Sequence, residues 1–158
     1  MAVEMLLNIP GVKGESMVSG HSDEIDVMSM SWGMSHSGTA QVGGGNSGGK
    51  ADVHDLSVTK FIDAASPNLM LHCCTAKHFA EIVLTMRKMG EQPMDYCVFT
   101  LTDTIITSVQ TGGSNHGDQM TESVSFNFAK WKVEYKTQTA SGKAGATISA
   151  EYSVEENK

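Results

Sequence analysis

Apolar and polar residues alternate along several stretches of this chain, which is the pattern of β-strands that place one face in a core. Residues 3–9 alternate in this way and end at a Pro-Gly turn signal. In residues 24–34, 51–62 and 124–135 the apolar positions change between odd and even numbers part-way along. We interpret these three stretches as long strands that each contain a β-bulge, because a bulge adds one residue and bends the strand.

The alternation of apolar and polar residues, with a period of two, returns in residues 82–86, 97–109 and 148–154, and these stretches predict further strands. Residues 90–95 form a hairpin-type break, and residues 111–118 form a glycine-containing loop. Long bent strands favour a small closed or nearly closed β-barrel over a flat sandwich, because a sheet has to curve in order to close. The predicted fold class is therefore all-β (mainly β), with a single helix.

That helix is predicted over residues 66–76. Ser66 is expected to cap its first turn, and Pro67 occupies the first helical position. Apolar residues then recur four apart, and the helix is expected to end near Thr75 or Ala76, before period two resumes.

A glycine-rich loop is predicted over residues 38–50. Five of the seven residues 43–49 are glycine, and fixing such a backbone in a regular element costs more entropy than for other residues. The loop ends at Lys50, where the next alternating stretch begins.

The length of 158 residues predicts one domain, residues 1–158, that buries a core without disulfides. The N-terminus has no basic flank, and its apolar run is too short and interrupted for a signal peptide or a membrane span. We therefore expect a soluble protein made in the cytosol, with no membrane insertion.

Three cysteines, an odd number without metal-site spacing, predict reduced thiols that pack in the core: Cys73, Cys74 and Cys97. The net charge is −7, and Arg87 is the single arginine among eleven Lys and Arg residues. No cationic stripe is available to neutralise phosphates, so we expect no nucleic-acid partner.

Two motif matches in the glycine-rich loop look catalytic. Residues 44–50 match most of the phosphate-binding pattern G-x-x-x-x-G-K, but Ala51 follows the lysine where Ser or Thr is needed, and a strand pattern follows where a helix is needed. Residues 45–49 match the nucleophile elbow G-x-S-x-G, but again a strand leaves in place of a helix. We interpret both matches as products of a glycine-rich composition.

His72 beside Cys73 suggests a Cys–His pair, but adjacent residues on a helix point about 100° apart and do not face each other. The other histidines show no metal-binding spacing. The sequence therefore predicts no catalytic residues, no cofactor and no supported metal site.

A set of short motifs, in this order and spacing, resembles the haemolysin-coregulated protein (Hcp) family of bacterial type VI secretion systems. They run from the first residues to about Tyr135: Lys13-Gly14-Glu15-Ser16, Glu24-Ile25-Asp26-Val27, Ser31-Trp32-Gly33, the Gly43 to Gly49 loop, Leu56-Ser57, Thr59-Lys60, Asp63, Ser66-Pro67-Asn68-Leu69, Lys77-His78, Thr111-Gly112-Gly113 and Thr121-Glu122. The sequence departs from the family at Ala76, where a glycine is frequent, and after Thr137, where the match is loose.

The resemblance implies a small β-barrel of two sheets with one flanking helix, assembled as a homo-hexamer into rings that stack into a hollow tube. It further implies a contractile sheath and a spike protein as partners, and small effector proteins carried in the lumen. Such a protein is assembled in the bacterial cytoplasm and secreted without a cleaved signal peptide. The resemblance also implies that the protein is not an enzyme. The alternatives are a small-molecule-binding barrel and a tube-linked effector enzyme.

Two sets of residues are candidates for these contacts. Ser29, Ser31 and Gly33 lie on the face opposite the bulky apolar residues of their strand, and we expect them to face the lumen and its cargo. The alternative is that they are ordinary solvent-facing strand positions. For ring stacking we expect the glycine-rich loop: Gly43, Gly44, Gly45, Asn46, Ser47, Gly48, Gly49 and Lys50.

Overall fold

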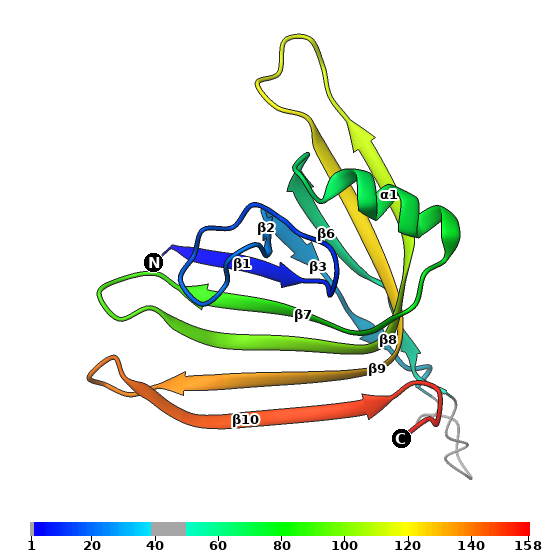
Figure 1. Ribbon diagram of the computed structural model, residues 1–158. Coiled ribbons are helices and arrows are strands. Elements are labelled where there is room, and N and C mark those ends of the chain that lie inside the picture. Colours follow the sequence, from blue (N-terminus) through cyan, green and yellow to red (C-terminus); the bar gives the residue numbers. More distant parts are fainter. Residues whose placement is uncertain (1, 39–49) are drawn as a thin grey trace.

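The computed structural model describes residues 2–38 and 50–158. Within these ranges the chain forms strands and one helix (Figure 1). The elements are β1 (Val3–Asn8), β2 (Ile25–Val27), β3 (Ser29–Ser31), β4 (Met34–Ser35), β5 (Asp52–Val53), β6 (Leu56–Phe61), α1 (Ser66–Thr75), β7 (Phe79–Lys88), β8 (Met94–Gly112), β9 (Thr121–Gln138) and β10 (Ala144–Ser153). The predicted residues 43–49 of the stacking loop lie outside the described residues.

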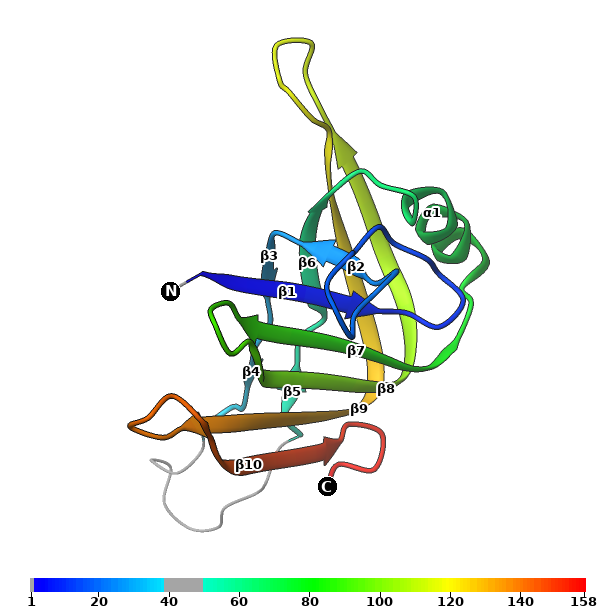
Figure 2. The ribbon, with the colours of Figure 1, turned by 60° about the vertical axis from the view of Figure 1, so that its left-hand side comes forward.

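The main sheet has the strand order β2-β1-β7-β8-β9-β6-β3, and β10 pairs with the second half of β9. Strands β2 and β3 stand at opposite ends of this order, yet they are separated in the chain by Met28 alone. The Met28 N–H donates to the Thr59 carbonyl at 2.8 Å, which brings the two ends of the sheet together. Figures 1 and 2 show the resulting curved, nearly closed barrel with α1 on one flank, and the predicted mainly β fold class is confirmed.

The first predicted bulge, in residues 24–34, is wrong. The stretch contains β2 and β3, which pair with different strands: β2 with β1 and β3 with β6. The change from odd to even apolar positions arises because the chain leaves one end of the sheet and joins the other at Met28. A strand exchange and a bulge produce the same shift of phase in the sequence.

The second predicted bulge, in residues 51–62, is also two strands. β5 pairs with β4 in a small separate sheet, and β6 belongs to the main sheet. The third shift of phase does lie within one continuous strand, β9, but the register irregularity of the β8–β9 pair falls between Ile106 and Ser108 of β8.

In β8 and in β9, the set of alternate residues that points into the core changes from even to odd numbers or the reverse, and both changes occur at the same paired position. Before Asp103 the buried position in β8 is Leu101, and after it the buried positions are Thr104 and Ile106. Asp103 has a left-handed backbone with φ 52°, and it lies at the level of Ala129 because Thr102 pairs with Lys130 and Thr104 with Phe128. Residues 97–109 therefore do form one strand, as predicted, but the period-two interpretation that placed Cys97, Phe99, Leu101, Ile105 and Val109 on one face is wrong.

A single apolar core fills the inside of the curved sheet. Its largest fully buried members include Phe126, Ile25, Leu56, Leu69, Ile82, Leu84 and Leu101. They come from β2, β6, α1, β7, β8 and β9, so strands from both ends of the curved sheet contribute to the same core, whereas β10 contributes no buried residue. Burial of this apolar surface is the main force that holds the strands in their curved arrangement.

Helix α1 has the predicted position but a different start. Ser66 is the first helical residue, and the N-cap is Ala65, which makes no side-chain cap bond. The Ser66 hydroxyl accepts from the Asp63 N–H at 3.0 Å, and Asp63 Oδ1 accepts the Ala65 N–H at 3.0 Å. The turn before the helix is thus stabilised by Asp63, and the predicted capping role of Ser66 is wrong.

The end of α1 is as predicted. The helix stops at Thr75, and Ala76 takes a left-handed conformation with φ 52°. The Lys77 N–H then donates to the His72 carbonyl at 3.1 Å, which satisfies a helix-end acceptor.

Cys74 is exposed, so its predicted core packing is wrong, whereas Cys73 is half-buried against the core.

Candidate functional site

The four strands β3, β6, β9 and the second half of β8 carry a continuous face of small hydroxyl and amide side chains. Cross-strand partners share a face of a sheet. One row joins Ser31, Ser57, Ser125 and Ser108, and the next row joins Ser29, Thr59, Ser123 and Gln110. We call these eight residues the hydroxyl face.

The hydroxyl face lies on the side of the sheet away from the core. The residues that alternate with it on these strands include Val58, Val124 and Ile106, which are buried in the core. Every member of the hydroxyl face is exposed or half-buried. The Ser57 and Ser125 hydroxyl oxygens lie 2.9 Å apart, so this pair is bonded across the strands.

None of the eight side chains ionises at physiological pH. Asp55 lies at the border of the hydroxyl face. Its carboxylate accepts hydrogen bonds from the Thr107 hydroxyl at 2.7 Å and from the Asn127 amide at 2.9 Å, so each carboxylate oxygen already has a donor within the same subunit. The eight positions offer hydrogen-bonding groups and neither charge nor large apolar side chains across four strands. Phe61, the next residue on this face of β6, is 42% exposed and borders them on the other side. Such a surface contacts other molecules without a strong preference for their charge.

The predicted site residues that the structure describes do not all lie on the hydroxyl face. Ser29 and Ser31 belong to the hydroxyl face, while Gly33 lies between β3 and β4, where its carbonyl accepts the His54 N–H at 3.0 Å. Lys50 is exposed and is followed by strand β5, where a phosphate-binding loop requires a helix. Sequence reasoning missed the other six members of the hydroxyl face. Their alternation was visible in the sequence, but the pairing that joins them was not.

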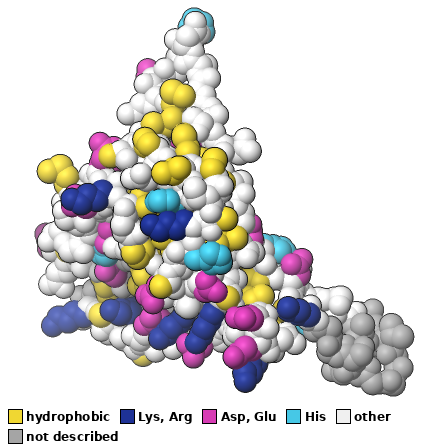
Figure 3. Space-filling view, turned by 45° about the vertical axis from the view of Figure 1, so that its right-hand side comes forward, with side chains coloured by type: hydrophobic (Ala, Val, Ile, Leu, Met, Phe, Trp, Pro, Cys, Tyr) yellow, Lys and Arg dark blue, Asp and Glu magenta, His cyan; other side chains and the backbone are white. Residues whose placement is uncertain are grey.

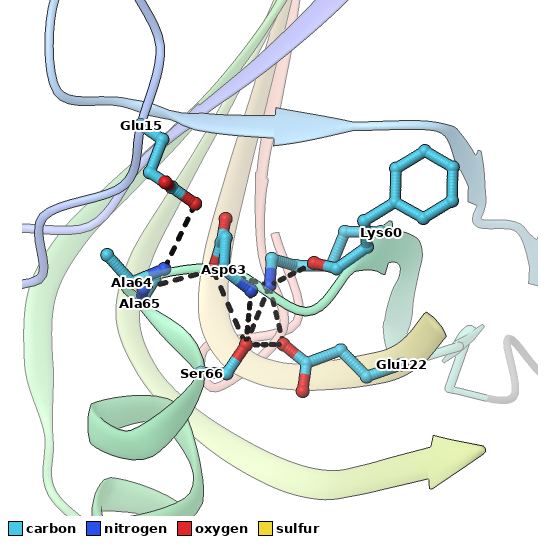
Figure 4. Close-up of polar contacts among 8 residues, drawn as sticks. Glu15, Lys60, Asp63, Ala64, Ala65, Ser66 and Glu122 are labelled. Carbon is cyan, nitrogen blue, oxygen red and sulfur yellow. Dashed lines mark hydrogen bonds and ion pairs between the residues drawn. The ribbon is translucent and has the colours of Figure 1, made fainter. Parts of the chain in front are cut away.

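A buried ion cluster lies on the opposite side of β6 and β9, beneath the start of α1 (Figure 4). Lys60 and Glu122 are opposite each other on these strands, with 0% and 1% of their surfaces exposed. The Lys60 ammonium bonds Glu122, Asp63 Oδ1 at 2.8 Å and the Phe61 carbonyl at 2.9 Å. The Ser66 hydroxyl donates to Glu122 at 2.7 Å, which connects the helix to the sheet.

The contacts of the ion cluster indicate that it stabilises the fold. Its single ammonium is surrounded by two carboxylates, a hydroxyl and a carbonyl, so the buried cation is fully compensated. These contacts join β6, β9 and α1 at one point, directly behind the hydroxyl face. The cluster therefore fixes the position of the strands that carry Thr59 and Ser123.

Other predicted chemical features occupy ordinary positions. The His72 ring packs edge-on against Phe79 with 5.6 Å between ring centres. In residues 2–38 and 50–158, no group of three or more His, Cys, Asp or Glu side chains is arranged to hold a metal ion. The helix in this part of the chain is too short to cross a membrane.

Figure 3 shows one face of the molecule, on which apolar side chains gather mainly in the upper half of the view and charged side chains mainly in the lower half. Positive groups there are interspersed with negative ones. Lys130 lies 3.8 Å from Glu151, and Lys132 lies 3.8 Å from Glu134. Such pairs differ from the basic track of a phosphate-binding surface.

Comparison with known proteins gives the family. Residues 6–135 match the family model described as "Type VI secretion system effector, Hcp". Protein hcp1 of Pseudomonas aeruginosa is 45% identical over 159 residues, which covers 99% of this chain and 98% of that protein. The chain belongs to the Hcp family.

Solved structures agree with this Hcp assignment. The crystal structure of Hcp1 from Salmonella typhimurium has a TM-score of 0.82 and 36% identity, with 100% of this chain and 99% of that chain covered. A structure described as that of a type six secretion system protein has a TM-score of 0.93 and 28% identity, with 99% of both chains covered.

Several motifs that carry the Hcp resemblance meet in the ion cluster: Lys60, Asp63, Ser66 and Glu122. Gly14 of another motif leaves no room for a side chain, because a Cβ there would lie 2.3 Å from the Glu24 carbonyl oxygen. At Ala76, where the family often has glycine, this Hcp chain adopts the left-handed backbone with an alanine. The loosely matched segment after Thr137 forms the edge strand β10.

Proposed function

We propose that this Hcp chain is the structural tube subunit of a bacterial type VI secretion system. Six copies of its single domain, residues 1–158, form a ring, and rings stack into a tube that carries or chaperones effectors in its lumen. The tube acts with a spike protein and a contractile sheath, without catalysis, nucleic acid or membrane insertion. The subunit is assembled in the cytoplasm and secreted without a cleaved signal peptide.

The hydroxyl face carries this proposal. A lumen wall has to pass varied proteins without holding them, which favours small, uncharged side chains over large apolar or charged ones. The hydroxyl face has this composition over four adjacent strands, and it includes the predicted lumen residues Ser29 and Ser31. Repetition of this face in each subunit of a ring gives a pore of uniform chemistry.

The edges of the same sheet support the formation of rings. In the described chain, β3 pairs with β6 on one side and with no strand on the other. Beyond Thr104, β8 pairs with β9 and no longer with β7. Unpaired strand edges are templates for pairing with another chain, and two different edges give the head-to-tail contact that a ring requires.

The inside of each barrel supports a structural role over the alternative of a small-molecule-binding barrel. Buried side chains such as Phe126, Leu101 and Ile82 fill the interior, and the Lys60–Glu122 pair closes the end next to α1. In the proposed assembly the space for cargo lies between subunits and not within one barrel.

Native mass spectrometry and light scattering of the purified full chain test this proposal. We expect a particle of six times the 16.9 kDa chain mass. Electron microscopy of the same sample is expected to show rings with an open centre. A monomer at tens of micromolar would contradict the ring and favour the small-molecule-binding alternative.

A further inference from the structure

The segment between β1 and β2, residues 12–24, folds back on itself at the surface of the barrel. The Gly14 N–H donates to the Asp23 carbonyl at 2.8 Å, the Ser16 N–H to the Glu24 carbonyl at 3.0 Å, and the Asp23 N–H to the Ser16 carbonyl at 2.9 Å. We call residues 12–24 the β1–β2 segment. Val12 at its start is buried in the core and Ser16 is also buried, whereas the part after Ser16 is attached to other strands by polar side chains.

His21 attaches one end of the β1–β2 segment to the hairpin formed by β7 and β8. Its Nδ1 lies 3.1 and 3.0 Å from the two carboxylate oxygens of Glu24, within the same segment. Its Nε2 lies 3.0 Å from Oδ2 of Asp95, which is 74 residues away on β8. The side chains of His21 and Glu24 are each only 12% exposed.

Arg87 of β7 completes this attachment. Its guanidinium donates to the Ser19 carbonyl of the segment at 3.1 Å and lies 3.7 Å from Oδ1 of Asp95. The charged groups around His21 are therefore Glu24 from its own segment and Asp95 from β8, with Arg87 from β7 on the far side of Asp95.

The geometry requires a proton on both ring nitrogens of His21. Ionised carboxylates only accept hydrogen bonds, and a neutral imidazole has a single N–H. Both contacts are hydrogen bonds only in the imidazolium form. Burial alone lowers the pKa of His21, but the hydrogen bonds and charges of Asp95 and Glu24 outweigh it, and the pKa lies above its ordinary value.

We infer that His21 is a proton-dependent latch: its imidazolium form fastens the β1–β2 segment to the β7–β8 hairpin, and its deprotonation loosens the segment. The direction in pH follows from linkage. Because the pKa of His21 is higher in the fastened state than in the loosened state, fastening is fully favoured below the ordinary pKa of histidine. It weakens as the pH rises through the raised pKa.

A further hydrogen bond attaches the β1–β2 segment to the chain before the helix. Glu15 Oε2 accepts the Ala64 N–H at 3.2 Å, just before α1. Burial, followed by the charges of Asp63, Glu4 and Glu15, raises the pKa of the nearby Asp26 of β2.

Hydrogen exchange of the full-length protein tests the latch. Rates are measured at several pH values between about 6 and 9 and corrected for the intrinsic pH dependence of exchange. Between the ordinary and the raised pKa of His21, we expect the opening constant of residues 12–24 to rise by up to about tenfold per pH unit. The His21→Gln variant is expected to show fast exchange in this segment at every pH. His116→Gln, a control in the exposed loop between β8 and β9, should match the parent protein.

Nuclear magnetic resonance titration of the His21 ring gives a second measurement that does not depend on the His21 variant. We expect a midpoint above the ordinary histidine value, and a lower midpoint in Asp95→Asn, which keeps the ring but removes one carboxylate. Exchange of residues 12–24 that does not change with pH in the parent protein would overturn the latch. So would a ring that titrates at or below its ordinary pKa.

Discussion

Lys60 and Glu122 lie opposite each other on β6 and β9 and form an ion pair from which water is excluded on both sides. Removal of one partner leaves the other charge buried and unpaired, which is far more costly than loss of a surface pair. We therefore predict that Lys60→Met destabilises the fold by about 3–5 kcal/mol. Urea unfolding followed by tryptophan fluorescence measures this loss.

The matched control for this prediction is Lys130→Met, because Lys130 and Glu151 form an exposed pair at 3.8 Å. This change should cost no more than about 1 kcal/mol. The double variant Lys60→Met, Glu122→Leu should recover part of the stability lost by Lys60→Met alone, because the fully buried carboxylate is removed with the ammonium. The Asp63 carboxylate remains and keeps its hydrogen bond from the Ala65 N–H. Equal effects of Lys60→Met and Lys130→Met would refute the structural role of the ion cluster.

Ala76 provides a prediction in the stabilising direction. Its left-handed backbone, φ 52°, is strained for any residue with a Cβ and unstrained for glycine. We expect Ala76→Gly to raise the free energy of unfolding by about 0.5–1 kcal/mol. Ala80→Gly, at an exposed position of β7, should lower it by a similar amount, because glycine weakens a strand. A loss of stability in Ala76→Gly, measured by the urea midpoint, would contradict the observed helix end.

Ser31 tests whether the hydroxyl face lines a lumen. An arginine at an exposed strand position usually changes stability by no more than about 0.5 kcal/mol, so Ser31→Arg should still fold and form rings. Cargo retention should fall, because the change is repeated in every subunit around one pore. The control is Ser149→Arg on the exposed strand β10, for which retention should not change.

The measurement for Ser31 compares the amounts of effector that co-purify with rings of the parent protein and of the two variants. Loss of rings in Ser31→Arg would place this residue in a contact between subunits. Unchanged effector retention in intact rings would place it on the outer wall and would remove the hydroxyl face from the lumen.

The glycine-rich loop yields a prediction from the sequence alone. Replacement of residues 43–49 by a Gly-Ser pair should leave single rings intact and reduce their stacking, because the glycine-rich sequence is expected to reach the neighbouring ring. Electron microscopy of tube lengths measures this effect. Equilibrium dialysis with ATP is expected to show no binding for the parent protein. Nucleotide affinity that disappears in Lys50→Ala would instead favour the phosphate-binding interpretation of the loop.

Local patterns in the sequence determined the class and the approximate position of most elements. Period two predicted the strands at residues 3–9 and 82–86, and the Ser66-Pro67 pair with apolar spacing of four predicted the helix. These features depend on side chains close together in the chain. The family motifs added the Hcp assignment, because their order and spacing were specific even though each was short.

Only the tertiary structure decided which strands are neighbours. A shift of phase at Met28 has the same appearance in the sequence whether the strand bulges or changes partner, and the pairing of β2 with β1 and β3 with β6 settles the question. The same pairing joins Ser31 to Ser57 and Ser125 and so creates the hydroxyl face. Burial is also a property of the folded chain: Lys60 and Glu122 are 62 residues apart, and ordinary statistics place both on the surface. They form a buried pair because β6 and β9 set them opposite each other and α1 covers them, which no local pattern records.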